Sequence, residues 1–553
     1  MSERGKRWGV LPSYWSWQGQ LNETTVETED AILRAMGALG ENPPRPRRLK
    51  LPPDPCAIAP NRAWGWAVQL YAARSRDSWG IGDMADLRRL ARWSRKQGAE
   101  VLLLNPLGAQ TPILPYEASP YYASSRRFRN TMYIRVEEVE GAEQVAVELE
   151  PLRSAAHRLN DERHINYDEV FRLKSRALEA IFKAAPDPPR LGPWAHSKGQ
   201  ALLDFATYNA LAEEHGPAWR NWPVDLRHPK GSGVDAERRR LSHGVAFHVW
   251  QQFHVDRQMA RAAREIGLIT DVPVGFASDG FDAWRWQDLL AADMRVGAPP
   301  DEFFREGQDW GLPPFDPWKL RRARYEPFIE AIRSATTHAA GIRLDHVMGL
   351  FRLFWIPAGM GAAGGAYVRY PASDLLALLS QESRRAKAFV IGEDLGLVEP
   401  AVRRRLSQRS ALSYRLLWFE GPPPDQWPKN SVAAVATHDL PTLAGTWNLT
   451  EPDHRQHRLR QKLVDLTHAS DGTPPIDVAA TTYAALSASR SRIVLASLED
   501  ALSVEERPNV PGTTTEFPNW RLALPQSLEA IEKAEGPLRI SRALQDGRLR
   551  KRP

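Results

Sequence analysis

Short apolar segments recur along the chain from residue 64 onward and alternate with longer segments of helical periodicity. An apolar run bounded by polar residues is typical of a strand that helices cover on both faces, as in parallel sheets. Seven such runs, with an eighth expected near 508–512, predict an α/β fold, a (β/α)8 TIM barrel. The seven runs cover 66–71, 101–106, 268–274, 342–347, 389–393, 414–419 and 432–437.

The segment between the second and third runs is too long to be a single crossover. It carries helical periodicity over 169–185 and 198–215, which predicts a large, mainly helical insertion after strand 2. A polar segment that ends in a proline-rich linker comes before the first run. The predicted boundaries are 1–60 for a short N-terminal extension, 61–520 for the catalytic barrel, about 108–266 for the inserted subdomain and 521–553 for a C-terminal helix with a basic tail.

The composition indicates a globular protein and gives no sign of a nucleic-acid or membrane partner. Of 553 residues, 42% are hydrophobic and 25% charged, which are ordinary values. The net charge of +6 comes from scattered arginine clusters without a zinc-finger or RRM signature, so a solvated basic surface is favoured. No apolar run is long enough to span a membrane, and no secretory signal is present. Cys56 is the only cysteine, which favours a reducing, cytoplasmic compartment.

No metal or cofactor is predicted. The glycines of 359–364 satisfy the G-x-G-x-x-G pattern, but a dinucleotide fingerprint also needs a helix that begins at the glycines. The following residues, 365–371, favour an extended loop instead. His248 and His254 are six residues apart, a poor match for one helix face, and no cysteine accompanies them as a zinc ligand.

Three acidic residues follow three of the predicted strands. Asp345 comes directly after the strand expected from Gly341, Glu393 directly after the strand expected from Ala388 one βα unit later, and Asp439 after the seventh run. Catalytic groups of TIM barrels lie at the carboxyl ends of the strands, and unpaired carboxylates are costly to bury. These residues could instead be strand-end caps or ion-pair partners, but three at one barrel mouth favour a catalytic site.

Glycoside chemistry requires this kind of acidic group. A retaining enzyme uses a carboxylate nucleophile and a carboxylic acid about 5 to 5.5 Å apart. Arg343, two residues before Asp345, would face the same side of the strand and keep that carboxylate ionised. His438, beside Asp439, can donate a hydrogen bond to a sugar hydroxyl.

At these residues the sequence resembles a known family, glycoside hydrolase family 77 of the α-amylase clan, the 4-α-glucanotransferases or amylomaltases. Thr437-His-Asp-Leu-Pro-Thr442 and Asn509-Val-Pro-Gly-Thr513 are two of the matching segments. Each segment alone is weak evidence, whereas together they are specific. The others lie at 71–83, 104–107, 119–121, 124–126, 297–301, 307–311, 343–346, 392–396 and 413–415.

The resemblance implies roles for individual residues. It makes Asp345 the nucleophile, Glu393 the acid/base and Asp439 the stabiliser of the transition state. It places a loop that folds over the glucan groove at 297–311. The substrate-binding positions that it implies are Arg343, His438, Ser119, Tyr121, Asp271, Asp301, Phe303, Gln308 and Trp310.

The resemblance also implies the partners, an α-1,4-glucan donor and a glucose or maltooligosaccharide acceptor. Transfer in place of hydrolysis follows from the family and not from the spacing of the acids. A hydrolase of the same clan is therefore the alternative enzyme. A non-catalytic carbohydrate-binding barrel is a further alternative, and its mark would be the loss of one of the three acids. The oligomeric state is not predicted.

Overall fold

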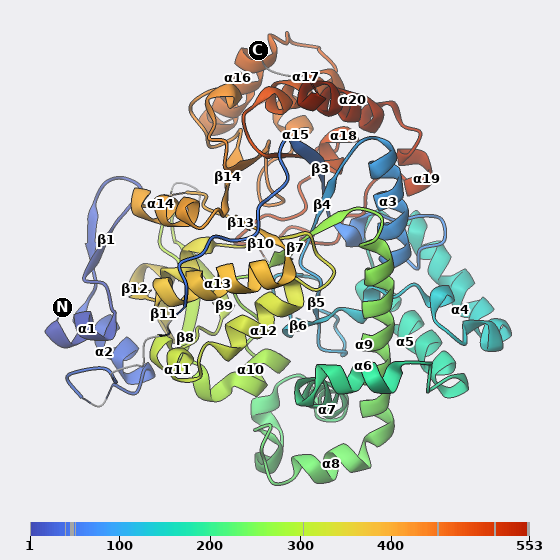
Figure 1. The fold of residues 1–553 in the computed structure, drawn as a ribbon, viewed down its shortest axis with the longest axis vertical. Coiled ribbons are helices and arrows are strands. Elements are labelled where there is room, and N and C mark those ends of the chain that lie inside the picture. Colours follow the sequence, from blue (N-terminus) through green and yellow to red (C-terminus); the bar gives the residue numbers. More distant parts are fainter. Residues whose placement is uncertain are drawn as a thin grey trace.

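Eight parallel strands close into a barrel at the centre of the molecule (Figure 1). The computed structural model describes residues 2–38, 40–44, 49, 51–301, 304–396, 398–450, 453–513 and 516–549. Each barrel strand pairs with the barrel strands that come before and after it in the chain, which confirms the predicted TIM barrel. The strands are β3 (Ala63–Val68), β4 (Val101–Leu104), β7 (Gly267–Val272), β10 (Gly341–Leu344), β13 (Phe389–Gly392), β14 (Leu412–Leu416), β15 (Ser431–Ala434) and β16 (Ile493–Ser497).

The prediction of the eighth strand near 508–512 is wrong. Strand β16 lies at Ile493–Ser497 and pairs with β15 and β3. Its apolar, partly β-branched run suits a strand that is buried on both faces. Residues 508–512 include Pro508 and Pro511, which have no backbone N–H to donate to a sheet ladder. They belong to the loop that follows the last strand.

Helices of the expected periodicity surround the barrel. Helix α3 begins after Asp83, whose side chain accepts the N–H groups of Ala85 and Asp86 in a capping box. None of the helices in the described part of the chain is long and apolar enough to cross a bilayer. Outside the insertion and the N-terminal segment, the α-helices of the described chain are α3 (Met84–Lys96), α10 (Phe281–Trp286), α11 (Pro317–Arg322), α12 (Glu326–Ala335), α13 (Ala372–Ala386), α14 (Pro400–Gln408), α15 (Leu443–Trp447), α16 (His454–Thr467), α17 (Pro475–Ala488), α18 (Leu498–Ala501), α19 (Leu528–Ile531) and α20 (Glu535–Leu549).

The chain between β4 and β7 forms the mainly helical insertion that the sequence predicts after strand 2. Its long last helix, α9, packs against α7 and returns the chain to the barrel beside α3 (Figure 1). A short ladder of β5 (Gly108–Ala109) and β6 (Ser125–Arg129) stands at its entrance. Its helices are α4 (Ala146–Arg158), α5 (Tyr167–Ala184), α6 (Leu191–Lys198), α7 (Gln200–His215), α8 (Val234–Arg240) and α9 (Ser242–Ala262).

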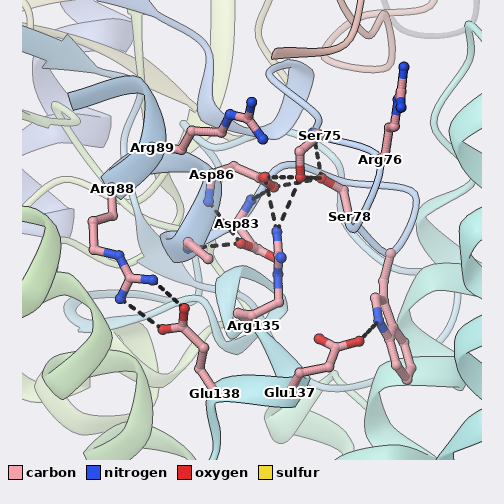
Figure 2. Close-up of polar contacts among 12 residues, drawn as sticks. Ser75, Arg76, Ser78, Asp83, Asp86, Arg88, Arg89, Arg135, Glu137 and Glu138 are labelled. Carbon is pink, nitrogen blue, oxygen red and sulfur yellow. Dashed lines mark hydrogen bonds and ion pairs between the residues drawn. The ribbon is translucent and has the colours of Figure 1, made fainter. Parts of the chain in front are cut away.

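A buried polar network ties the insertion to the loop after β3 (Figure 2). Arg135 donates from Nε to Asp83 Oδ2 at 2.6 Å and from Nη2 to Asp86 Oδ1 at 2.9 Å. Ser78 donates to the other oxygen of Asp86 at 2.6 Å, and Ser75 also donates to Asp86. The network therefore fixes the start of α3 against the segment that carries Arg135.

A second, antiparallel sheet lies beside the barrel and was not predicted. Its strand order is β12, β11, β8 and β9, and β8 and β9 form a hairpin. The N-terminal segment packs on this sheet, where the ring of Tyr14 contacts those of Phe354 and Tyr367 edge-on. The strands of this sheet are β8 (Met294–Ala298), β9 (Gln308–Leu312), β11 (Arg352–Pro357) and β12 (Ala366–Arg369). The N-terminal segment contains α1 (Glu3–Trp8), β1 (Ser13–Trp15), β2 (Leu21–Glu23) and α2 (Val26–Ala35).

Candidate active site

The three predicted acids follow barrel strands, two of which are neighbours. Asp345 follows β10 and Glu393 follows β13, and these strands pair in parallel register. The ladder continues into the acids, because Glu393 donates its N–H to the Leu344 carbonyl at 3.0 Å and Asp345 donates to Val272 at 3.1 Å. Asp439 follows β15 beyond a short loop. The barrel thus presents Asp345 and Glu393 side by side at one mouth.

Arg343 lies at the centre of the charges below these acids. It donates to both oxygens of Asp271, at 2.7 and 2.6 Å, and its Nη2 lies 3.1 Å from Asp345 Oδ1. Tyr121 donates its hydroxyl to Asp271 at 2.6 Å. Arg343 is 4% exposed, so one buried cation holds two carboxylates in fixed orientations. The predicted ion pair with Asp345 is present, but Arg343 makes two hydrogen bonds to Asp271 and a longer contact with Asp345.

Burial sets the protonation of the two neighbouring acids. It raises the pKa of Asp345 to about 6, against the opposing effect of Arg343. Asp271, Glu393 and Asp439 each raise the pKa of Asp345 further, as expected when these acids share one region. Burial also raises the pKa of Glu393, although Arg343 and two backbone N–H groups lower it in part. Near neutral pH, Asp345 is therefore mainly ionised.

In the described part of the chain, the side chain of Glu393 accepts hydrogen bonds from backbone N–H groups only. The N–H of His346 donates to Oε2 at 2.9 Å and the N–H of Leu395 donates to Oε1 at 2.8 Å. His346 has a left-handed backbone with φ 43°, which directs its N–H towards the glutamate. Both bonds stabilise the charged form of Glu393 and so oppose the rise in pKa that burial causes.

Asp439 and His438 form an ion pair on the opposite side of the mouth. His438 Nε2 lies 3.4 Å from Asp439 Oδ2, and Asn509 donates from Nδ2 to Asp439 Oδ1 at 2.6 Å. Burial disfavours both charges, but the pairing outweighs it, so the pKa of His438 is raised and that of Asp439 is lowered. The Asp439 side chain is 39% exposed, which leaves it open to a ligand.

Two residues beyond those predicted complete this side of the site. Asn509 belongs to a segment that the resemblance matched, but no role was assigned to it. Trp520 packs its ring against those of Tyr121 and His438, with centroids 5.3 and 5.1 Å away. The signal for Asn509 was its motif, whereas nothing in the local sequence singled out Trp520 from the other 19 tryptophans.

The other predicted substrate positions lie around this cluster. The hydroxyl of Ser119 accepts the N–H of Tyr121 at 3.3 Å. Trp310 Nε1 donates to Gln308 Oε1 at 3.1 Å, and its ring contacts that of His346 edge-on at 5.3 Å. The β8–β9 hairpin thereby reaches the loop that holds Glu393.

The tip of that hairpin is described only in part. Asp301 lies there and accepts the N–H of Phe304 at 2.7 Å. The predicted position Phe303 lies outside the described residues. Within the predicted groove-covering segment 297–311, the strands of the hairpin cover 297–298 and 308–311.

A small cavity extends from the cluster into the barrel. It has a volume of about 60 Å³, and its lining includes Asp271, Arg343, His438, Asn105 and Glu499. A cavity needs roughly 10–15 Å³ per water by this measure, so this space suits a few water molecules and not a sugar ring.

One group of potential metal ligands stands outside the barrel mouth. Among the described residues, Glu214, His215 and Glu237 are the three whose ligand atoms lie within 4.8 Å of one another. Arg240 forms ion pairs with both glutamates. A cation of the chain therefore already occupies this acidic corner, and the group carries no argument for a metal.

A closed parallel barrel with three acids converging at the carboxyl ends of its strands defines a class, the barrel enzymes that act on glycosidic bonds. The comparisons specify the class further. Residues 68–528 match the family model described as 4-alpha-glucanotransferase, glycoside hydrolase family 77. The chain belongs to this family.

Individual relatives agree with this assignment. The 4-alpha-glucanotransferase of Mycobacterium tuberculosis is 40% identical over 532 residues, which cover 85% of this chain and 72% of that protein. The 4-alpha-glucanotransferase of Haemophilus influenzae is 31% identical over 542 residues, covering 86% and 78%. The amylomaltase of Corynebacterium glutamicum superposes with a TM-score of 0.85 at 26% identity, covering 98% of this chain and 99% of that one.

Proposed function

We propose that this chain carries out the reaction of its family, 4-α-glucan transfer, by a retaining double displacement centred on Asp345 and Glu393. The observation that carries the proposal is the placement of these two acids after adjacent barrel strands, with Arg343 beside the first. The substrates are an α-1,4-glucan donor and a glucose or maltooligosaccharide acceptor. Cys56 is the only cysteine and is buried, which is consistent with a protein that functions in a reducing cytoplasm.

In the first step, Asp345 attacks the anomeric carbon of the donor. The bond between that carbon and the glycosidic oxygen breaks, and Glu393 gives its proton to the departing oxygen. The products are a glycosyl ester on Asp345 and a shortened glucan with a free 4-hydroxyl. Burial raises the pKa of Glu393, which favours the protonated form that this role needs.

In the second step, the acceptor reverses these changes. Glu393, now a carboxylate, takes the proton of the acceptor's 4-hydroxyl, and the oxygen attacks the anomeric carbon. The ester bond to Asp345 breaks, which restores both acids and retains the anomeric configuration. Asp439 lies opposite and stabilises the positive charge that develops on the sugar.

The remaining residues bind the sugar at the cleaved bond. His438 carries a positive charge over a wider pH range because of Asp439, so it can donate to a sugar hydroxyl. Tyr121 is held by Asp271 and offers a ring face to the glucose. The β8–β9 hairpin, with Gln308 and Trp310, covers the groove and delays the entry of water until an acceptor binds.

Maltotriose tests transfer against hydrolysis, the alternative reaction of related barrels. Transfer yields glucose together with oligomers longer than maltotriose, because the severed unit joins another sugar. Hydrolysis yields only shorter products. A product series that only shortens, measured by anion-exchange chromatography at early times, would contradict the proposal.

A further inference from the structure

Trp520 stands at the centre of an aromatic group beneath the sugar-binding residues. Its ring centroid lies 5.3 Å from Tyr121 and 5.1 Å from His438, and these two rings are 4.9 Å apart. Tyr71, from the loop after β3, contacts the far side of Trp520 at 6.5 Å. Trp520 is only 5% exposed. It therefore supports two residues of the site and has little surface left for a substrate.

The backbone holds Trp520 in an unfavourable conformation. Its φ is +63°, a left-handed value that bulky side chains rarely adopt and that persists only where the surroundings enforce it. Two hydrogen bonds enforce it here. The Trp520 N–H donates to the Pro508 carbonyl at 3.0 Å, and the Tyr167 hydroxyl donates to the Trp520 carbonyl at 2.7 Å.

The loop that carries Trp520 also holds His438 and Asp439 from the other side. The Asn509 N–H donates to the His438 carbonyl at 3.2 Å, and the Asn509 side chain donates to Asp439. Asn519 closes the loop by accepting the Val510 N–H at 2.8 Å. One folded segment thus fixes the backbone, the carboxylate and the ring face of the His438–Asp439 pair.

We propose that Trp520 is a positioning residue, which holds the rings of His438 and Tyr121 where they must lie to bind the sugar at the cleaved bond. This inference rests on the proposed function, because it assumes that His438 acts on the substrate. Strain that is retained next to a site, and not relieved by a glycine, is expected where the side chain has a specific task.

The alternative role for Trp520 is ordinary core packing, and it predicts a different result. A tryptophan that only fills space would lower stability when truncated, and its loss would reduce activity independently of His438. Trp447 in α15 is the matched case. It is 4% exposed, its Nε1 donates to the Thr473 carbonyl at 2.8 Å, and its ring stacks on Arg460.

A double-mutant cycle with Trp520→Ala and His438→Ala separates the two claims. Residues that act through one another show strong non-additivity, whereas independent residues do not. We expect Trp520→Ala alone to lower kcat/KM on the order of 30- to 100-fold, as misplaced substrate-binding groups do. In the His438→Ala background, the same change should cost several-fold less, because only the placement of Tyr121 is then still lost. Losses that multiply in full would overturn the proposal.

Two further variants keep the test decisive. Trp520→Phe retains a ring and serves where the alanine variant does not fold, with a loss of about fivefold that again becomes smaller in the His438→Ala background. Any loss in kcat/KM from Trp447→Phe should multiply in full with the loss from His438→Ala. Circular dichroism and the thermal midpoint report folding in each case.

Loss of activity in Asp345→Asn tests the proposed function separately, so the two ideas can fail independently. A cycle without coupling, alongside an inactive Asp345→Asn, would overturn the role of Trp520 alone. An active Asp345→Asn would overturn the proposed function itself.

Discussion

Two clusters of buried acids in this chain share the same charge arrangement and differ in what their oxygens contact. In the first, at the start of α3, Asp83 and Asp86 are 0% and 1% exposed at their side chains and share Arg135 (Figure 2). In the second, at the barrel mouth, Asp345 shares Arg343 with Asp271 and is 20% exposed. Each cluster has one arginine for two carboxylates, so charge counting does not distinguish them.

The difference lies in the remaining acceptor positions. Both oxygens of Asp86 accept a serine hydroxyl, and Oδ2 also accepts the Asp83 N–H at 3.0 Å. At the barrel mouth, no donor in the described chain reaches Asp345 Oδ2, whereas Oδ1 has Arg343. A fully satisfied buried acid fixes structure, whereas an acid with a free oxygen facing a cleft can bind or attack a ligand.

The largest effect that tests this contrast is expected from Asp345→Asn. The amide cannot form the glycosyl ester, so we expect kcat to fall by about 10⁴-fold or more. The fold should remain, because the change removes a buried charge that is only partly compensated. Steady-state rates with maltotriose and a denaturant titration measure both quantities.

The matched change in the first cluster is Asp86→Asn, which should behave in the opposite way. It weakens the hydrogen bonds that converge on the buried Asp86 carboxylate. We therefore expect lower stability, while kcat of the folded fraction stays within about twofold of the original value. An Asp345→Asn protein that keeps its transfer rate would end the contrast between the two clusters.

A second prediction concerns Arg135. Arg135→Ala leaves two buried carboxylates without their cation, and such a loss typically costs about 3–5 kcal/mol of stability. The control is Arg172→Ala in an exposed pair, where the side chains of Arg172 and Glu169 are 53% and 40% exposed and about 0–1 kcal/mol is at stake. Urea titrations followed by fluorescence compare the two. Equal losses would show that the network in Figure 2 does not anchor the insertion.

The two clusters also show how far the sequence can be read. The barrel and the acids Asp345, Glu393 and Asp439 were predictable, because buried parallel strands give long apolar runs and an acid directly after such a run is unusual. The last strand was misplaced because the apolar run of Ile493–Ser497 continues into Leu498-Glu-Asp-Ala, which favours a helix and hides the boundary.

Other features depend on contacts between distant segments. The sheet of β8, β9, β11 and β12 has short strands joined by loops, so its periodicity is weak. Trp520 meets Tyr121 across about four hundred residues of sequence, which no local pattern records. Asp83 and Asp86 lie within a matched segment, but only Arg135, from the insertion, shows that they form a closed network.

A smaller effect is expected from Asn509→Ala. The change removes the 2.6 Å hydrogen bond to Asp439 Oδ1 but leaves His438 as a partner of the other oxygen. A hydrogen bond to a charged group is worth about 1.5–3 kcal/mol, which corresponds to a loss in kcat of about 10- to 100-fold if it acts mainly in the transition state. Asn509→Asp, which places a second charge there, should lose more. An unchanged kcat in both would remove Asn509 from the site.

The smallest effect expected is a shift along the pH axis, and it tests why the mouth acids differ from the closed cluster. Because the pKa of Asp345 is raised to about 6, the nucleophile is ionised above that pH and protonated below it. We expect kcat/KM to fall about tenfold per pH unit below about 6, since this ratio reports groups of the free enzyme. Asp271→Asn removes a negative charge that raises this pKa and frees Arg343 for Asp345, so the acid limb should move to lower pH even if the maximal rate falls. Asp279→Asn, at a half-exposed acid paired with Arg220, is the control and should leave the limb in place. If the acid limb of the kcat/KM profile does not move in Asp271→Asn, Asp271 does not set the pKa of the nucleophile. Arg343 would then have only a structural role at the barrel mouth, as Arg135 has in the closed cluster.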